Sequence, residues 1–140
     1  MTLQEAEEQI IEEFSYFEDW MDKYNYIIEL GKSLPLIDAR FKTDEYRIEG
    51  CQSNVWLQAD FKDGRLHFTA DSDAIITKGI INLLIRVLSD RTPQEILAAD
   101  LSYIDAIGLK NHLSPTRSNG LTAMIQQIRR FAIVYQAKSE

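Results

Sequence analysis

The sequence predicts an α+β fold in which helices pack against a small antiparallel sheet on one core. Two observations predict it. Apolar residues recur every three or four positions near both ends of the chain and over 75–88, which is the helical period. Between 55 and 70 they alternate with a period of two, which is typical of half-buried strands. The 140 residues are 45% hydrophobic and 26% charged, so we expect residues 1–140 to form a single domain.

The N-terminal region predicts two helices. Thr2 and Glu5 have the spacing of a capping box, which begins an amphipathic helix. Its apolar stripe consists of Leu3, Ala6, Ile10, Phe14, Phe17 and Met21. A second helix, or a bent continuation of the first, runs from about Asp19 to Leu30. Gly31 follows it, which is a normal residue at a helix end.

A hairpin is predicted around Asp63-Gly64, a strong two-residue turn signal. Pairing outward from this turn brings apolar residues together: Phe61 with Leu66, Ala59 with Phe68, and Leu57 with Ala70. A slip of one residue would expose that whole face to water, so we expect this register and no other.

The next helix is predicted to be the central buried one. Asp71-Ser72-Asp73 supplies its N-cap, and apolar residues cover most of the helix over 75–88 and leave Lys78, Asn82 and Arg86 as a polar stripe. Three further helices follow. A short one begins at Thr92-Pro93, another covers 103–107, and a long one begins after Ser114-Pro115. The apolar stripe of the long helix is Leu121, Met124, Ile125, Ile128, Phe131 and Tyr135.

The charge distribution excludes some function classes. A net charge of −7 argues against a nucleic-acid partner, which would select a basic face. No apolar run approaches the ~20 residues of a membrane span, and the N-terminus is acidic where a signal peptide would be basic. We therefore expect no membrane association and a cytoplasmic protein. Residues 1–30 hold nine acidic side chains against one lysine, either a solvated helix face or an acidic docking surface.

The inventory of reactive residues is small. One cysteine and two histidines, His67 and His112, are too few for a structural zinc or an iron–sulfur cluster. The glycines are isolated, so there is no phosphate-binding loop, and nothing in the sequence pairs a histidine with the cysteine. We expect no metal site. We expect His67, on the polar face of a strand, and His112, in a loop, to be structural or incidental.

Cys51 is the remaining candidate for chemistry. It lies where an irregular segment meets the first strand, after Gly50, which permits unusual backbone angles, and before Gln52 and Ser53. A thiolate there is able to take a sulfur atom from another protein as a persulfide without a metal. The alternative is a cysteine that only packs as a small hydrophobe. The polar flanks favour the functional interpretation.

Several blocks of the chain resemble the SufE family of sulfur acceptors. They keep the family's order and cover nearly the whole sequence: 26–31, Gly50-Cys51-Gln52-Ser53, Val55-Trp56-Leu57, Asp71-Ser72-Asp73-Ala74, Lys78-Gly79, Thr92-Pro93 and 112–121. The resemblance implies a SufE/IscU-like fold with a small curved antiparallel sheet of about three strands. This chain lacks the further cysteines with which an IscU-type scaffold holds a cluster, so transfer is favoured over assembly.

The resemblance also implies a function. Cys51 would accept persulfide sulfur from a SufS-like cysteine desulfurase, stimulate that enzyme and pass the sulfur to a SufBCD-like scaffold. The pyridoxal phosphate belongs to the desulfurase, so this chain is a carrier and needs no cofactor. Two alternatives remain open: the partner is a Csd-type desulfurase, or the chain is a non-catalytic adaptor that binds a desulfurase. Formation of a homodimer is also left open.

Four other residues are implied to support Cys51. Arg117 would steady the persulfide or bind the partner, Asp73 would contact the partner or cap a helix, and Gly50 and Gln52 flank the thiol. We further expect an apolar pocket to shield the resting thiol, because persulfides are vulnerable in bulk solvent. Its expected walls are Val55, Trp56 and Leu121.

Overall fold

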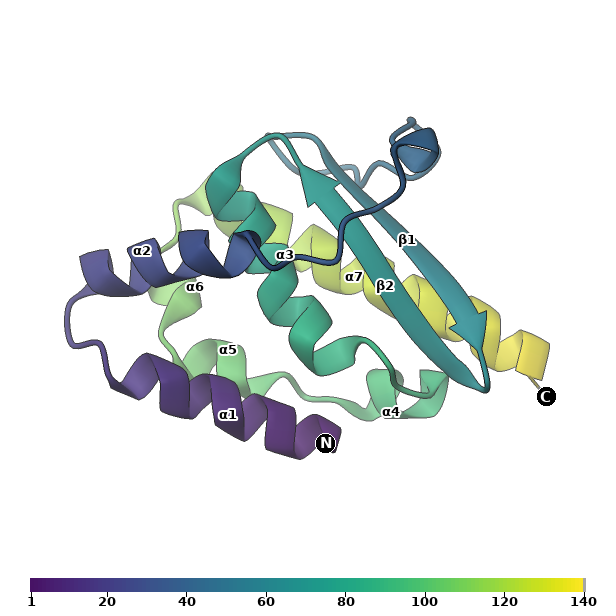
Figure 1. Cartoon of the computed structure of the whole chain (residues 1–140), viewed down its shortest axis with the longest axis horizontal. Helices are drawn as coiled ribbons and strands as arrows, with labels where there is room; N and C mark the ends of the chain where they lie inside the picture. Colours follow the sequence, from purple (N-terminus) through teal and green to yellow (C-terminus); the bar gives the residue numbers. More distant parts are fainter. Residues whose placement is uncertain (140) are drawn as a thin grey trace.

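The computed structural model describes residues 1–139, and Figure 1 shows their arrangement. The helices in this part of the chain are α1 (Leu3–Ser15), α2 (Trp20–Gly31), the 3-10 helix η1 (Ala39–Phe41), α3 (Ile75–Leu88), α4 (Pro93–Ala98), α5 (Ser102–Ala106), α6 (Leu109–His112) and α7 (Pro115–Ser139). The strands are β1 (Val55–Lys62) and β2 (Arg65–Ser72). The predicted α+β class is confirmed.

The hairpin forms in the predicted register. Phe61 pairs with Leu66, Ala59 with Phe68 and Leu57 with Ala70. Asp63 and Gly64 both have positive φ, 55° and 77°, as a type I′ turn requires. The apolar face of the hairpin packs against α3 and α7, and α7 extends along it toward the turn (Figure 1).

The sheet has two strands in the described residues, where about three were expected. A third segment does pair with β1, but only through one antiparallel bridge, between Arg47 and Trp56. Turns at 44–46 and 49–50 interrupt that segment on both sides of the bridge, so a ladder does not extend. On the other edge, Leu36 makes a single parallel bridge to Ala70.

Capping was predicted correctly for α1 and α4. Thr2 with Glu5, and Thr92 with Glu95, form complete capping boxes. The predicted N-cap of α3 is wrong, because its N-cap residue is Ala74, which has no side chain that accepts a hydrogen bond.

The acidic residues before α3 have other partners. Asp71 is buried and pairs with Lys42 and with Lys78, the latter at 3.3 Å. Asp73 accepts hydrogen bonds from Asn54 instead of from the helix. Both carboxylates therefore tie segments together that are distant in the sequence.

Helix α3 is the central buried helix, as predicted. Each residue of its polar stripe has a polar partner. Lys78 pairs with Asp71, and Asn82 donates to the Leu30 carbonyl. Arg86 pairs with Glu13. α3 crosses α2 so closely that a Cβ on Gly79 would lie 1.9 Å from the Ile27 carbonyl oxygen. Gly79 is therefore required by the packing of α2 on α3.

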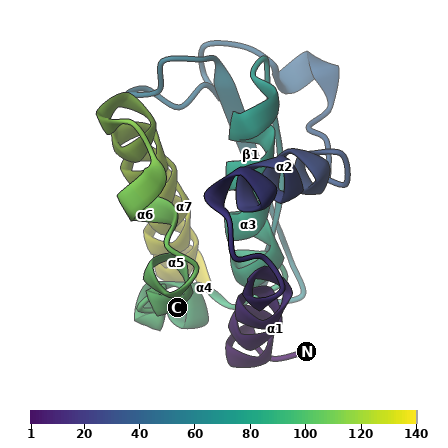
Figure 2. The same ribbon diagram turned by 90° about the vertical axis from the view of Figure 1, so that its left-hand side faces the viewer.

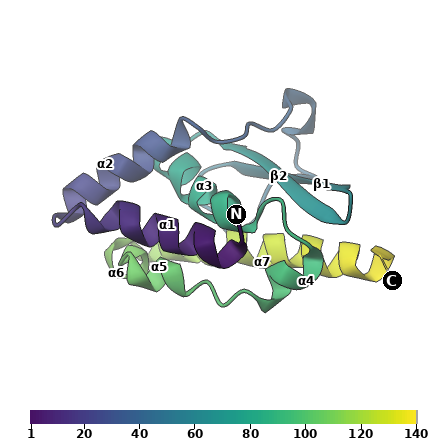
Figure 3. The ribbon, with the colours of Figure 1, turned by 60° about the horizontal axis from the view of Figure 1, so that its bottom comes forward.

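The other helices form a second group beside α3 and the hairpin. Figure 2 shows α5, α6 and α7 on one side, with α2 and α3 on the other. α1 packs on α3 and α5 (Figure 3). The buried Tyr103 hydroxyl donates to the Leu83 carbonyl and so joins the two groups. His112, expected in a loop, ends α6 and stacks on Trp20 with ring centroids 4.3 Å apart.

No helix among residues 1–139 combines the length and the apolar character that a bilayer crossing would need.

Candidate functional site

Cys51 lies on a loop that reaches across the molecule. In Figure 2 the segment before β1 runs over the top from η1 to the first turns of α7. Gly50, just before the cysteine, has φ of +94°, which L side chains rarely adopt. The predicted position at a junction between elements is thus observed, and glycine is needed at 50 for the backbone to turn.

A cavity of about 270 Å³ lies under this loop. The loop, the N-terminal part of α3 and the first turns of α7 build it. Its walls are Cys51, Gln52, Ser53, Ala74, Ile76, Thr77, Ile80, Thr116, Arg117, Gly120 and Met124. Apolar side chains of α3 and α7 form its deeper surface, and polar groups of the loop and of α7 form its rim.

The Cys51 thiol is half-buried in the cavity wall. Its Sγ lies 3.7 Å from the Gly120 carbonyl oxygen, the distance of a weak S–H hydrogen bond. Burial raises the pKa of the Cys51 thiol above its ordinary value, because an apolar environment disfavours the thiolate. The resting thiol is therefore protonated at neutral pH.

No histidine lines the cavity. His67 lies beside Asp90 and His112 beside Trp20, so neither is available to Cys51 as a base. A Cys-His hydrolase, which needs that pairing, is not supported. Residues 1–139 also contain no group of three or more His, Cys, Asp or Glu that could hold a metal ion.

Polar contacts hold the part of the loop that follows Cys51. Asp73 accepts from the Asn54 backbone N–H at 3.1 Å and from its Nδ2 at 2.9 Å. Ser53 and Thr77 hydroxyls lie 3.3 Å apart. Asp73 and Asn54 are both exposed, so the contact that closes the base of the loop is open to solvent.

Arg117 reaches the cavity from the first turn of α7. Its backbone N–H donates to the Ser114 hydroxyl, which fixes the start of the helix. Its guanidinium lies 5.9 Å from the centroid of the Tyr24 ring, a cation–π distance. Arg117 is exposed and lines the cavity, as does Gln52. The structure thus brings Arg117 and Gln52 to the same opening as Cys51.

The expected shielding walls were wrong. Val55 is fully buried in the main core, Trp56 lies beside Lys42 on the other face of β1, and Leu121 faces the core. The actual apolar walls are Ile76, Ile80 and Met124, with Gly120 against the sulfur. Sequence reasoning missed these residues because they were assigned to the core stripes of their helices. The four-residue spacings 76–80 and 116–120–124 indicate that these residues share one face of each helix, and this pattern could have predicted the cavity walls.

A family model described as "SufE: Fe-S metabolism associated domain" matches residues 8–132. The chain belongs to the SufE family. An uncharacterized SufE-like protein of Rhizobium meliloti is 39% identical over 127 residues, which cover 87% of this chain and 91% of that one. Another, from Rhizobium etli, is 40% identical over 135 residues and covers 93% and 91%.

Two further similarities extend the comparison. "SufE-like protein 1, chloroplastic/mitochondrial" of Arabidopsis thaliana is 37% identical over 134 residues, which cover 95% of this chain and 36% of that longer protein. The solution structure of a hypothetical protein from Thermus thermophilus has the same fold, with a TM-score of 0.76 at 19% identity. That alignment covers 96% of this chain and 97% of the other. SufE membership implies a sulfur-acceptor role in Fe–S metabolism and an interaction with a cysteine desulfurase.

Proposed function

We propose that Cys51 accepts sulfur as a persulfide from a pyridoxal-phosphate-dependent cysteine desulfurase and passes it to an iron–sulfur assembly scaffold. The observation that carries this proposal is the position of the lone cysteine on a loop over a largely apolar cavity, with no histidine beside it. Such a thiol is protected at rest and has no base of its own, as suits a carrier. Residues 1–140 act as one sulfur-acceptor domain in the cytoplasm.

The transfer step is a thiol exchange on sulfur. The Cys51 thiolate attacks the outer sulfur of the desulfurase persulfide, a new S–S bond forms, and the desulfurase cysteine leaves as a thiolate. No net oxidation occurs. The cofactor remains with the desulfurase, which is a SufS-like enzyme or its Csd-type paralogue, and the acceptor downstream is a SufBCD-like scaffold.

The raised pKa of Cys51 sets a condition on this step. A protonated thiol in the cavity is a poor nucleophile, so the loop must carry Cys51 out of the cavity when the partner docks. Gly50 provides a turning point, and the exposed Asp73–Asn54 contact is the one that opens. Gln52 contacts the partner, and Arg117 stabilises the persulfide anion through its guanidinium.

The test uses a cognate desulfurase and free cysteine. We expect mass spectrometry to find one added sulfur on Cys51, and Cys51→Ser to lose both the adduct and the stimulation of the desulfurase. The matched control is Cys51→Ser with Ser102→Cys, which moves the only thiol to an exposed site at the start of α5. Full stimulation by Cys51→Ser would instead support a non-catalytic adaptor, and an equally active Ser102→Cys control would refute any role for the loop.

A further inference from the structure

Gly120 forms the part of the cavity wall that lies against the cysteine. A Cβ built on Gly120 would lie 3.5 Å from Cys51 Sγ, 3.9 Å from its Cα and 4.0 Å from its Cβ. These are ordinary van der Waals distances, and all three nearest atoms belong to Cys51. An alanine at this position would therefore fit beside the free thiol.

The other five glycines each have a local reason to be glycine. Three of them, Gly50, Gly64 and Gly108, have positive φ, and two, Gly31 and Gly79, lie where α2 and α3 cross. Gly120 has neither property: it lies within α7, and nothing in the backbone or in the neighbouring helices excludes a methyl group. Glycine in a helix interior is less favourable than alanine by ~1 kcal/mol. Folding alone would thus be better served by alanine.

We propose, on the basis of the proposed persulfide function, that Gly120 is a specificity-determining residue that leaves room for the outer sulfur of the Cys51 persulfide. The S–S bond extends the side chain by about 2 Å from Sγ, which already points at the Gly120 carbonyl. The cavity of about 270 Å³ holds the added atom easily.

The surroundings of that space suit a persulfide. Ile80 and Met124 line the cavity next to Gly120 and are both buried, so a sulfur atom there is removed from water and from dissolved reductants. A methyl group on residue 120 would occupy the space beside Sγ and turn the outer sulfur toward the open rim. The thiol form would keep its stability with this methyl group, and only the persulfide form would be destabilised.

The experiment compares free and loaded protein without any desulfurase. Dithiodipyridine converts Cys51 to a mixed disulfide. Hydrosulfide then attacks Sγ, forms the persulfide bond and releases the pyridine thiolate. Mercaptoethanol removes the outer sulfur as sulfide, while two mercaptoethanol molecules join in a disulfide. The variants are Gly120→Ala and, as the matched control, Asn119→Ala, an exposed neighbour in the same turn of α7.

We expect Gly120→Ala in the thiol form to melt at or above the wild-type temperature. In its loaded form, sulfide release should be roughly tenfold faster than in wild type, which corresponds to ~1.4 kcal/mol of overpacking. Loading should also lower the melting temperature of this variant alone. Asn119→Ala should match wild type in both forms.

Equal sulfide release from loaded Gly120→Ala and loaded wild type would overturn the proposal. So would a large loss of stability in the thiol form of Gly120→Ala, because a purely structural need for glycine would explain it. Failure of a desulfurase to load the wild-type protein would refute the proposed function, yet it would leave these chemically loaded measurements unchanged. The two failures are therefore distinguishable.

Discussion

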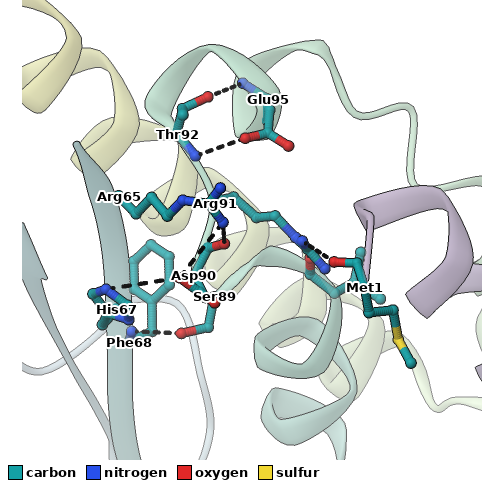
Figure 4. A network of polar contacts seen from close by, with 10 residues as sticks. Met1, Arg65, His67, Phe68, Ser89, Asp90, Arg91, Thr92 and Glu95 are labelled. Carbon is teal, nitrogen blue, oxygen red and sulfur yellow. Dashed lines mark hydrogen bonds and ion pairs between the residues drawn. The ribbon is translucent and has the colours of Figure 1, made fainter. Parts of the chain in front are cut away.

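The two ends of helix α3 are held in different ways. At its C-terminal end, the connector formed by residues 89–92 joins the hairpin, and Figure 4 shows Asp90 of this connector beside Arg65 and His67. Asp90 N–H donates to the Leu66 carbonyl and Leu66 N–H donates to the Arg91 carbonyl, at 2.7 and 2.8 Å. The Ser89 hydroxyl accepts from Phe68 N–H. These bonds extend the edge of β2.

The buried Arg91 side chain stabilises the C-terminal end of α3. It is 6% exposed, and its guanidinium donates to the carbonyls of Val87 and Met1 (Figure 4). A buried charged group with these partners cannot move without leaving polar atoms unpaired. The connector is therefore part of the folded core.

The N-terminal end of α3 carries the Cys51 loop, where the contacts are mixed. The Asp73–Asn54 side-chain pair is exposed, and the Ser53–Thr77 hydroxyl pair and the thiol are half-buried. The Ser72 hydroxyl and the Asp73 N–H also donate to the Asn54 carbonyl. Exposed hydrogen bonds open at a small cost in free energy. The C-terminal end of α3 is tied into the core, so we expect the loop at the other end to open while the core remains folded.

The largest expected effect is at the rigid end. Arg91→Leu should lower the free energy of unfolding by about 3 kcal/mol, because it leaves the Val87 and Met1 carbonyls without their donor. Denaturant titration measures this loss. Arg65→Leu is the control, since Arg65 is half-exposed and its pairing with Asp90 is worth less than ~1 kcal/mol.

The same two variants test the independence of the two ends. In the absence of denaturant, both should leave the rate of Cys51 alkylation by iodoacetamide within about twofold of wild type. If Arg91→Leu instead accelerated alkylation in proportion to its loss of stability, the loop would open only by global unfolding, and the comparison would be refuted.

A smaller change in stability but a clear change in reactivity is expected from Asp73→Ala. The variant removes the two hydrogen bonds that the Asp73 carboxylate accepts from Asn54 and so shifts the loop toward its open form. Alkylation of Cys51 should become roughly tenfold faster, since two bonds of ~0.7 kcal/mol each are lost. Asp105→Ala, which removes an exposed ion pair with Lys110, should not change the rate. An unchanged rate in Asp73→Ala would mean that this contact does not restrain the loop.

The elements of the fold were predictable where the signal was local. The hairpin register follows from Asp63-Gly64 and the alternation beside it, and the capping boxes are patterns of four residues. The burial of α3 is visible in its composition. The width of the sheet was not predictable, because pairing of Arg47 with Trp56 depends on turns that the family resemblance did not specify.

The candidate site was predictable only at its centre. Cys51 and Gly50 are recognisable from the sequence alone, and Arg117 through the resemblance. The cavity walls were not, because Ile80 and Met124 come from two helices that are distant in the sequence and whose faces are set by packing. The sequence predicts Asp73 as a helix cap. In the structure its carboxylate instead accepts hydrogen bonds from Asn54 and so restrains the Cys51 loop.

The smallest expected effect concerns pH. Because burial raises the folded-state pKa of Cys51, the folded protein holds this proton more tightly than the unfolded chain, whose thiol has a pKa of about 8.5. The resulting stabilisation is fully present below about pH 8.5 and is lost as the pH rises through the higher folded-state pKa. We expect the difference in unfolding free energy between wild type and Cys51→Ser to be constant from pH 6 to about 8 and then to decrease.

Asp73→Ala sharpens this prediction, because an open loop exposes the thiol to water. In that variant the alkylation rate should rise with pH around the ordinary thiol pKa, whereas in wild type the rise should lie at higher pH. A wild-type profile at or below the ordinary value would mean that Arg117, at the rim of the cavity, outweighs burial in the resting state. Cys51 would then be a thiolate before any partner docks, and opening of the loop would serve access to the sulfur and not its activation.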